Sequence, residues 1–304
     1  MSVLNEIRQE SPSQLQQLNQ LISAYIEVTK PKILVMLVFT SLCAAFVAAR
    51  GVPSISTMFF MLLSASLSAG GSAAINMWYD RDIDGIMERT AKRPIPAGVI
   101  DPVSVFRFGL FLGFLSIIIA FVFVNPLTAF LNAAGYLYYA VVYTMWLKRR
   151  TPLNIVIGGG AGAFPILIGW ASVTGSLNIT ALLMFLVVFL WTPPHSWALA
   201  LYKNEEYTKA GIPMMPVVKG ARSTKVQSLI YMVLLFICSI ILFVSGHFNS
   251  FYLAGALLFN GGLLYCTWKM WKEEDDQFVW AKRTFIFSLF YILGMFSAMV
   301  AGIL

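Results

Sequence analysis

Long apolar runs recur along this chain, and they restrict its possible folds more than any other feature. Nine stretches approach the roughly 20 apolar residues that a membrane-spanning helix needs. They cover about 33–49, 54–74, 103–124, 127–147, 152–174, 178–200, 226–246, 250–271 and 284–304. Only 12% of the 304 residues are charged, against about 25% in soluble domains. Because the alternating pattern of an outer-membrane barrel is also missing, the sequence predicts an all-α, polytopic membrane protein.

The charged residues indicate how these spans are oriented. If the N-terminus is cytoplasmic, the C-terminus lies outside, and the outer loops fall near 50–53, 125–126, 175–178 and 246–250. These outer segments contain one cation, Arg50, and no carboxylate, so the other 20 of the 21 Lys and Arg residues lie on the inner side. This asymmetry follows the positive-inside rule. That rule does not govern Asp and Glu, so their gathering on the inner side needs another cause.

Residues 1–24 form a polar segment that lacks the features of a signal or transit peptide. We therefore expect this segment to be cytoplasmic and the protein to reside in a bacterial inner membrane. The three cysteines, Cys43, Cys238 and Cys266, fall inside predicted spans, where they are interpreted as small apolar core residues. Residues 25–304 are expected to form a single transmembrane domain.

Two inner loops stand out by their length and polarity: 75–102, after the second span, and 201–225, after the sixth. Four spans separate them, which suggests two four-helix halves, each with a functional loop after its second helix, followed by a ninth helix. Internal duplication of this kind is common in membrane proteins whose site lies between the repeats. The two loops are predicted to cap an active site.

The glycine-rich segment 158–169 has a different explanation. Small residues let membrane helices approach one another closely. A phosphate-binding glycine loop would follow a strand and precede a Lys-Ser or Lys-Thr pair, and the segment has neither. Close helix packing is therefore the favoured interpretation.

The first long loop begins with a stripe of oxygen-bearing side chains. Asn76, Asp80 and Asp84 follow at four-residue steps, which on a helix places them along one face. In the second loop, Tyr202 and Glu206 repeat this spacing. Facing stripes would supply hard oxygen ligands for Mg²⁺, which is held by a few carboxylates together with substrate phosphates. The predicted metal ligands are Asn76, Asp80, Asp84 and Glu206.

Basic side chains gather beside both stripes. The candidates for diphosphate binding are Arg89, Lys92, Arg93, Lys148, Arg149 and Lys203. Guanidinium and ammonium groups hold phosphate oxygens that a metal leaves free. Because the surrounding walls are apolar spans, the ligand that fits is a prenyl diphosphate, which joins a polyanionic head to a hydrocarbon tail. An ordinary solvated loop would explain neither the carboxylate spacing nor the absence of acids on the outer side.

The segment NMWYDRDIDGIMERTAKRP resembles the first aspartate-rich motif of the UbiA superfamily of intramembrane prenyltransferases, in its Asn-x-x-x-Asp-x-x-x-Asp form. Other segments resemble the branch of that superfamily that acts on heme. They are VTKPKI (28–33), RTAKRPIPAG (89–98), LKRRTPLNIVIGGGAGAFPILIGW (147–170) and PPHSWALALYKNEEYTKAGIPMMPVVKG (193–220). The similarity runs from about residue 25 to the end. Tyr202 fits the heme branch, whereas Glu206 is a longer side chain than the usual Asp.

This resemblance implies transfer of a farnesyl group from farnesyl diphosphate to a vinyl group of heme b, with addition of water, to give heme o for terminal oxidase assembly. Mg²⁺ is the implied cofactor, and heme b is a substrate. Membrane lipid is an expected partner, a heme a synthase or terminal oxidase is a suggested one, and nucleic acid is not expected. The alternatives are a sister prenyltransferase acting on an aromatic acid or quinone precursor, and a membrane transporter. A transporter should carry polar groups at mid-membrane, whereas here they crowd the inner helix ends.

His195 precedes Glu206 by 11 residues, about three helical turns, and so falls on roughly the same stripe. From the residues alone, hydrogen bonding to carbonyl groups freed by Pro193 and Pro194 is the favoured role. The resemblance shifts the expectation to heme contact as an axial ligand, or to acceptance of a proton from attacking water. The expected catalytic set is Asn76, Asp80, Asp84, His195, Tyr202 and Glu206.

Overall fold

Apolar runs of this length become helices because a bilayer offers backbone groups no water to bond with. The computed structural model describes residues 14–303, and this part of the chain is helical almost throughout. Eight helical segments in it are long and apolar enough to cross a membrane. They are α2 (Pro31–Ala49), α3 (Ile55–Tyr79), α5 (Pro102–Phe123), the pair α7 (Asn154–Gly158) and α8 (Gly160–Thr174), α9 (Ile179–Tyr202), α11 (Met215–Val244), α12 (Ser250–Lys272) and α13 (Val279–Ala301). The chain is a multi-pass membrane protein.

The remaining predicted span, 127–147, is also helical but changes type part-way. The helix α6 (Pro126–Leu137) continues into η1 (Tyr138–Leu147), a π-helix. Its backbone bonds reach back five residues, as from the Lys148 nitrogen to the Tyr143 oxygen at 2.9 Å. With this composite helix, the nine predicted spans all have a helical counterpart in residues 14–303. The sequence did not predict the π-helix, a form that is frequent at functional sites.

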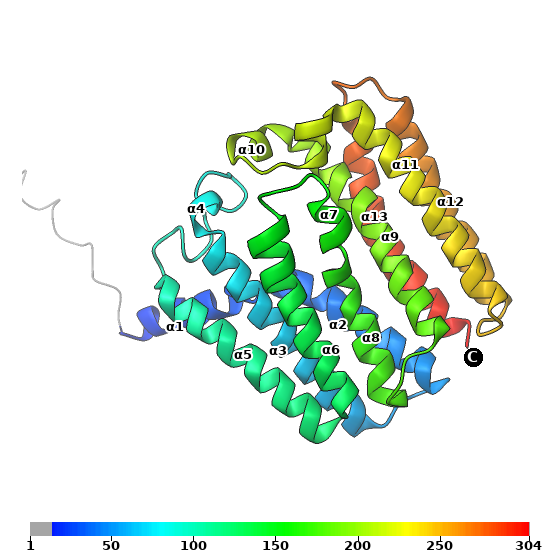
Figure 1. Cartoon of the computed structure of the whole chain (residues 1–304), viewed down its shortest axis with the longest axis horizontal. Coiled ribbons are helices and arrows are strands. Elements are labelled where there is room, and N and C mark those ends of the chain that lie inside the picture. The colour runs from blue at the N-terminus through cyan, green and yellow to red at the C-terminus, as the bar shows by residue number, and fades with distance from the viewer. Residues whose placement is uncertain (1–13, 304) are drawn as a thin grey trace, which may run out of the picture.

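Three short or peripheral helices complete the fold: α1 (Gln14–Val28), α4 (Arg81–Asp84) and α10 (Asn204–Lys209). Figure 1 shows α4 and α10 at the same end of the bundle, as expected if the two long loops belong to one site. The predicted loop 201–225 is largely helical, because α10 and the first turns of α11 occupy it. A left-handed backbone at Gly220 (φ 78°) separates those first turns from the rest of α11, a conformation that glycine adopts without strain.

Close helix approach depends on small residues. The helix α3 packs along α5, and α2 packs along α8. At Gly169, where α8 crosses α2, an added Cβ would lie 2.0 Å from the Ser41 carbonyl oxygen. In the glycine-rich segment, a Cβ at Gly158 would lie 2.2 Å from the Tyr143 ring. These contacts agree with the packing interpretation of that segment.

We expect Gly169→Ala to destabilise the protein, because the new methyl group would meet the backbone of α2 and force the two helices apart. Overpacking of this kind costs about 1–3 kcal/mol or more. Gly261→Ala in α12 is the matched control, since a Cβ there has nothing within 4 Å. Thermal unfolding in detergent, followed by fluorescence-detected size exclusion, should show a clear loss for the first variant only. Equal unfolding temperatures would contradict the close crossing.

Candidate active site

The carboxylate stripe keeps its alignment across a change of helix. The helix α3 ends at Tyr79, and Asp80 joins it to the single turn α4. The backbone nitrogen of Asp80 donates to the backbone oxygen of Asn76 at 2.9 Å. In the same way, the backbone nitrogen of Asp84 donates to the backbone oxygen of Asp80 at 2.8 Å. The four-residue repeat therefore persists, and Asn76, Asp80 and Asp84 are all buried. The Asp82 side chain, off this stripe, is 60% exposed.

Asp80 is the centre of the polar contacts at this end of the bundle. Its side chain has no exposed surface. Lys148 donates to Oδ2 at 2.5 Å, and the Asn76 amide donates to the same oxygen at 2.8 Å. Arg149 lies 3.5 Å from Oδ1. A buried carboxylate requires partners of this kind, because an uncompensated charge there would cost several kcal/mol, on the order of 3–5.

Asp84 fixes the chain that follows α4. Arg93 donates to its Oδ2 at 2.6 Å, and the Thr90 hydroxyl donates to its backbone oxygen at 2.8 Å. These bonds hold Thr90 and Arg93 against Asp84. Two of the predicted diphosphate-binding residues in this segment, Arg89 and Lys92, are exposed.

Arg149 links the loop after η1 to α4. Its guanidinium donates two bonds of 2.7 Å to the two oxygens of Asp82. These bonds are the main reason that the pKa of Asp82 is lowered and the pKa of Arg149 is raised. Arg149 also donates to the Tyr79 backbone oxygen at 3.0 Å, so it ties the end of α3 to the third polar loop.

The second predicted stripe is interrupted at Lys203. The backbone there leaves helical values (φ −112°, ψ 21°), so Tyr202 ends α9 while Glu206 lies in α10. The expected single stripe from His195 to Glu206 is therefore wrong. Lys203 donates to Glu206 Oε1 at 2.6 Å, which raises the pKa of Lys203. The other oxygen, Oε2, is buried without a hydrogen-bond partner.

The two long loops pack against each other. Ile83 and Met87 share a buried apolar cluster with Tyr207, Ile212 and Met214 of the second loop. Burial raises the pKa of Tyr207, and the positive charge of Arg89, followed by its side-chain hydrogen bond, acts in the opposite direction. The segments after α3 and α9 thus meet over one end of the bundle, although more than 100 residues separate them in the sequence.

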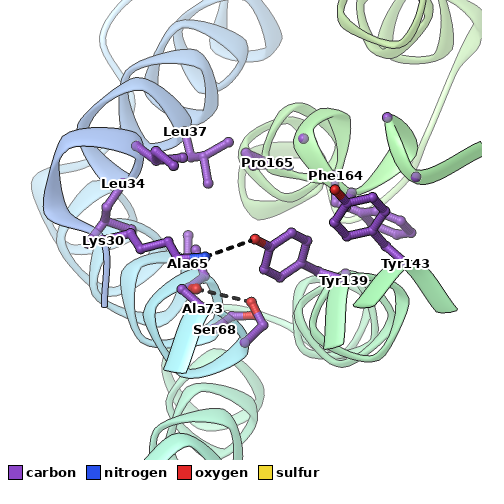
Figure 2. Close-up of a pocket in the computed structure, with 18 of the residues that line it drawn as sticks. Lys30, Leu34, Leu37, Ala65, Ser68, Ala73, Tyr139, Tyr143, Phe164 and Pro165 are labelled. Atoms are coloured by element: carbon purple, nitrogen blue, oxygen red, sulfur yellow. Dashed lines mark hydrogen bonds between the residues drawn. The ribbon is translucent and has the colours of Figure 1, made fainter. Parts of the chain in front are cut away.

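An apolar cavity of about 300 Å³ opens beside the stripe. It lies between α2, α3, η1 and α8, and Figure 2 shows the side chains that line it. Apolar lining residues include Leu34, Leu37, Ala65, Phe164 and Pro165. Its polar groups include the hydroxyls of Tyr139 and Tyr143, whose rings stack at 5.6 Å, and the ammonium group of Lys30. A hydrocarbon chain would fit this space.

Sequence reasoning assigned no role to Lys30 or Thr144. The Lys30 ammonium donates to Asn76 Oδ1 at 2.5 Å and lies 3.4 Å from the Tyr139 hydroxyl. Burial, and then the nearby Arg93 and Lys148 cations, lower the pKa of Lys30 to about 7. Thr144 accepts a bond of 3.0 Å from the Asn76 amide. The only sequence feature that pointed to Lys30 was its place in the VTKPKI segment. No sequence feature pointed to Thr144.

His195 lies on the side of α9 that faces α13. Its Nδ1 is 2.6 Å from the Ser288 hydroxyl, and its ring stacks between Trp191 at 4.3 Å and Phe285 at 4.8 Å. It does not line the cavity, although its neighbour Ser196 does. Nε2 is the nitrogen left for other chemistry, since Ser288 engages Nδ1.

The oxygen groups suit a magnesium site that substrate completes. Within residues 14–303, no three His, Cys, Asp or Glu side chains come together closely enough to hold a metal alone. Mg²⁺ does not need such a cage, because it is commonly bound through one or two carboxylates plus substrate phosphates. Asp80 and Asp84 provide two carboxylates, and the Asn76 amide oxygen, which accepts from the cavity-lining Lys30, provides a further oxygen. The unpartnered Glu206 Oε2 is a further oxygen in the facing loop.

Known proteins are similar to this chain in sequence. The sequence pattern of the UbiA prenyltransferase family matches residues 37–291, and this chain belongs to that family. A protein of Symbiobacterium thermophilum called protoheme IX farnesyltransferase is 46% identical over 287 residues, covering 94% of this chain and 96% of that protein. A Rhizobium etli protein of the same name is 46% identical over 278 residues, covering 91% and 88%.

Solved structures share the fold. A digeranylgeranylglyceryl phosphate synthase superposes with a TM-score of 0.78 at 18% identity, covering 93% of this chain and 98% of the other. A UbiA homologue from Archaeoglobus fulgidus, bound to DMAPP and Mg²⁺, gives a TM-score of 0.65 at 16% identity, with coverage of 90% and 98%. The predicted all-helical membrane fold and the resemblance to the UbiA superfamily are confirmed.

Proposed function

We propose that this protein transfers the farnesyl group of farnesyl diphosphate to a vinyl group of heme b, with addition of water, and so forms heme o. The observation that carries the proposal is the buried pair Asp80 and Asp84, linked to an apolar cavity through Asn76 and the cavity-lining Lys30. Membership of a prenyltransferase family supports the reaction type. The name shared by the relatives at 41–46% identity supports farnesyl and heme as the two substrates.

The first chemical step breaks the allylic C–O bond of farnesyl diphosphate, and the electron pair stays with the diphosphate. Lys148, Arg93 and Arg149 stand beside the carboxylates and would hold diphosphate oxygens as their charge grows. Mg²⁺, when bound by Asp80, Asp84 and the Asn76 oxygen, would add positive charge at the leaving group. Glu206, Lys203 and the neighbouring Tyr202 would complete the site from the second loop, and the two loops together would cap it.

The second step needs a dry surrounding, because bulk water would capture the allylic cation. The apolar walls of the cavity exclude water around the farnesyl chain. The stacked rings of Tyr139 and Tyr143 border the same space, and aromatic faces favour a nearby cation. The vinyl electrons of heme then form the new C–C bond. Water adds to the resulting cation and loses a proton, which leaves a hydroxyethylfarnesyl side chain.

The cellular setting follows from the charge pattern. We propose that the protein lies in a bacterial inner membrane with its N-terminus, α4 and α10 on the cytoplasmic side and its C-terminus outside. This orientation places the basic loops where the positive-inside rule expects them. It also opens the diphosphate site to the cytoplasm, from which the water-soluble diphosphate end of farnesyl diphosphate would enter. A heme a synthase or terminal oxidase is the proposed recipient of the product.

The direct test is product analysis with purified protein. Heme b, farnesyl diphosphate and Mg²⁺ should yield a product whose mass corresponds to heme b plus a farnesyl group plus water. Omission of Mg²⁺ should abolish its formation. If heme b stays unchanged while an aromatic acid or a quinone precursor is prenylated, the sister activity is correct and the heme assignment fails.

Replacement of Asp80 or Asp84 by Asn should reduce turnover at least about 100-fold, the order expected when leaving-group stabilisation is lost. Both variants should still insert and elute as folded protein. Asp276→Asn is the matched control, because Asp276 is exposed in the loop between α12 and α13. Turnover should be measured at saturating Mg²⁺. Full activity of Asp80→Asn or Asp84→Asn would contradict the proposal that these residues bind Mg²⁺.

His195 is proposed to contact heme through Nε2, as an axial ligand or as the base for the attacking water, with Ser288 and the two aromatic rings fixing its orientation. His195→Ala should therefore shift the Soret band of bound heme and reduce turnover. Ser288→Ala, which removes only the orienting hydrogen bond, should have a smaller effect. Unchanged heme affinity and turnover in His195→Ala would limit this histidine to a packing role.

A further inference from the structure

Lys30 belongs both to the cavity wall and to the polar stripe. It is the only charged side chain among the described residues that line the cavity. Its ammonium group donates to Asn76 Oδ1 and approaches the Tyr139 hydroxyl, and Figure 2 shows it extending toward Tyr139 across the cavity. Lys30 thus stands where apolar space ends and the oxygen ligands begin.

The position of Lys30 is held by its backbone. It adopts a left-handed conformation (φ 55°, ψ 60°) between α1 and α2, directly before Pro31. Its backbone nitrogen donates to the Glu27 oxygen at 2.9 Å. A residue other than glycine in this conformation is strained, and such strain is found where the surrounding structure fixes a functional geometry. The backbone turn between α1 and α2 therefore fixes where the Lys30 side chain starts.

The contacts of Lys30 differ from those of the other cations at the site. Lys148 is paired with Asp80, Arg93 with Asp84, and Arg149 mainly with Asp82. Lys30 contacts an amide oxygen and a phenol, and in the described part of the chain it forms no ion pair. No carboxylate in direct contact neutralises its charge, which can act on a bound anion.

We propose that Lys30 binds the oxygen that joins the farnesyl chain to the diphosphate and stabilises the charge left on it when the allylic C–O bond breaks. This inference rests on the proposed function, because a chain in the cavity and a diphosphate at Asp80 and Asp84 place that oxygen at their junction, beside Lys30. Carbon C1 and the oxygen separate, and the electron pair remains on the oxygen. The Lys30 ammonium keeps its protons and supplies a hydrogen bond.

The test compares Lys30→Met, Lys30→Arg and the control Lys32→Met, which removes an exposed lysine from the same turn. Lys30→Met should lower kcat about 100-fold, with KM for farnesyl diphosphate changed less than about threefold. Lys30→Arg should recover much of this loss. In titration calorimetry without heme, Lys30→Met should bind pyrophosphate with Mg²⁺ at least about tenfold more weakly than wild type. Lys32→Met should match wild type in both measurements.

The calorimetric measurement separates this inference from the proposed function, because it needs neither farnesyl nor heme. Unchanged pyrophosphate affinity in Lys30→Met would overturn the inference even if heme is the true acceptor. A second result would also overturn it. This is a loss of Mn²⁺ affinity in Lys30→Met as large as that in Asn76→Ala, measured by electron paramagnetic resonance without pyrophosphate. Lys30 would then only position the Asn76 amide. Loss of pyrophosphate affinity with intact Mn²⁺ binding supports the inference, whichever acceptor is used.

Discussion

A carboxylate with no exposed surface, that of Asp80, is the constraint around which this end of the bundle is organised. Burying such a charge is tolerated only when cations and hydrogen-bond donors surround it. Lys148 and Arg149 supply the charges, and the Asn76 amide supplies a further donor. Since these basic residues follow η1, the requirement ties that helix to the end of α3. Membrane helices bear such buried charges mainly where they serve function.

The same arrangement joins two environments. One is the group of buried carboxylates with their cations, which Asn76 joins through its bond to Asp80, and the other is an apolar cavity of about 300 Å³. Lys30 bridges the two through its bond to Asn76. A substrate with a diphosphate head and a hydrocarbon tail fits both halves at once. Ile83 and Met87 pack against the second loop at the same end of the bundle.

Much of this could be predicted because it depends on period and composition. Long apolar runs predict spans, and four-residue steps predict that Asn76, Asp80 and Asp84 share one face. Contacts between distant segments leave no such pattern: Lys30 and Asn76 are 46 residues apart, and Thr144 and Asn76 are 68 apart. The sequence also contained no sign of the backbone break at Lys203. The predicted stripe from His195 therefore continued to Glu206, which lies in a different helix. The five-residue bonding of η1 has no clear sequence signal, although it shapes the cavity wall.

The central claim is that the carboxylates after α3 hold a metal and a diphosphate at the mouth of the apolar cavity. A crystal structure with Mn²⁺ and an unreactive farnesyl diphosphate analogue tests it most directly, since anomalous scattering locates the metal. The account predicts a manganese peak within bonding distance of both Asp80 and Asp84, with the farnesyl chain between α2, α3 and α8. A metal peak away from these carboxylates, or a farnesyl chain outside the cavity, would contradict it.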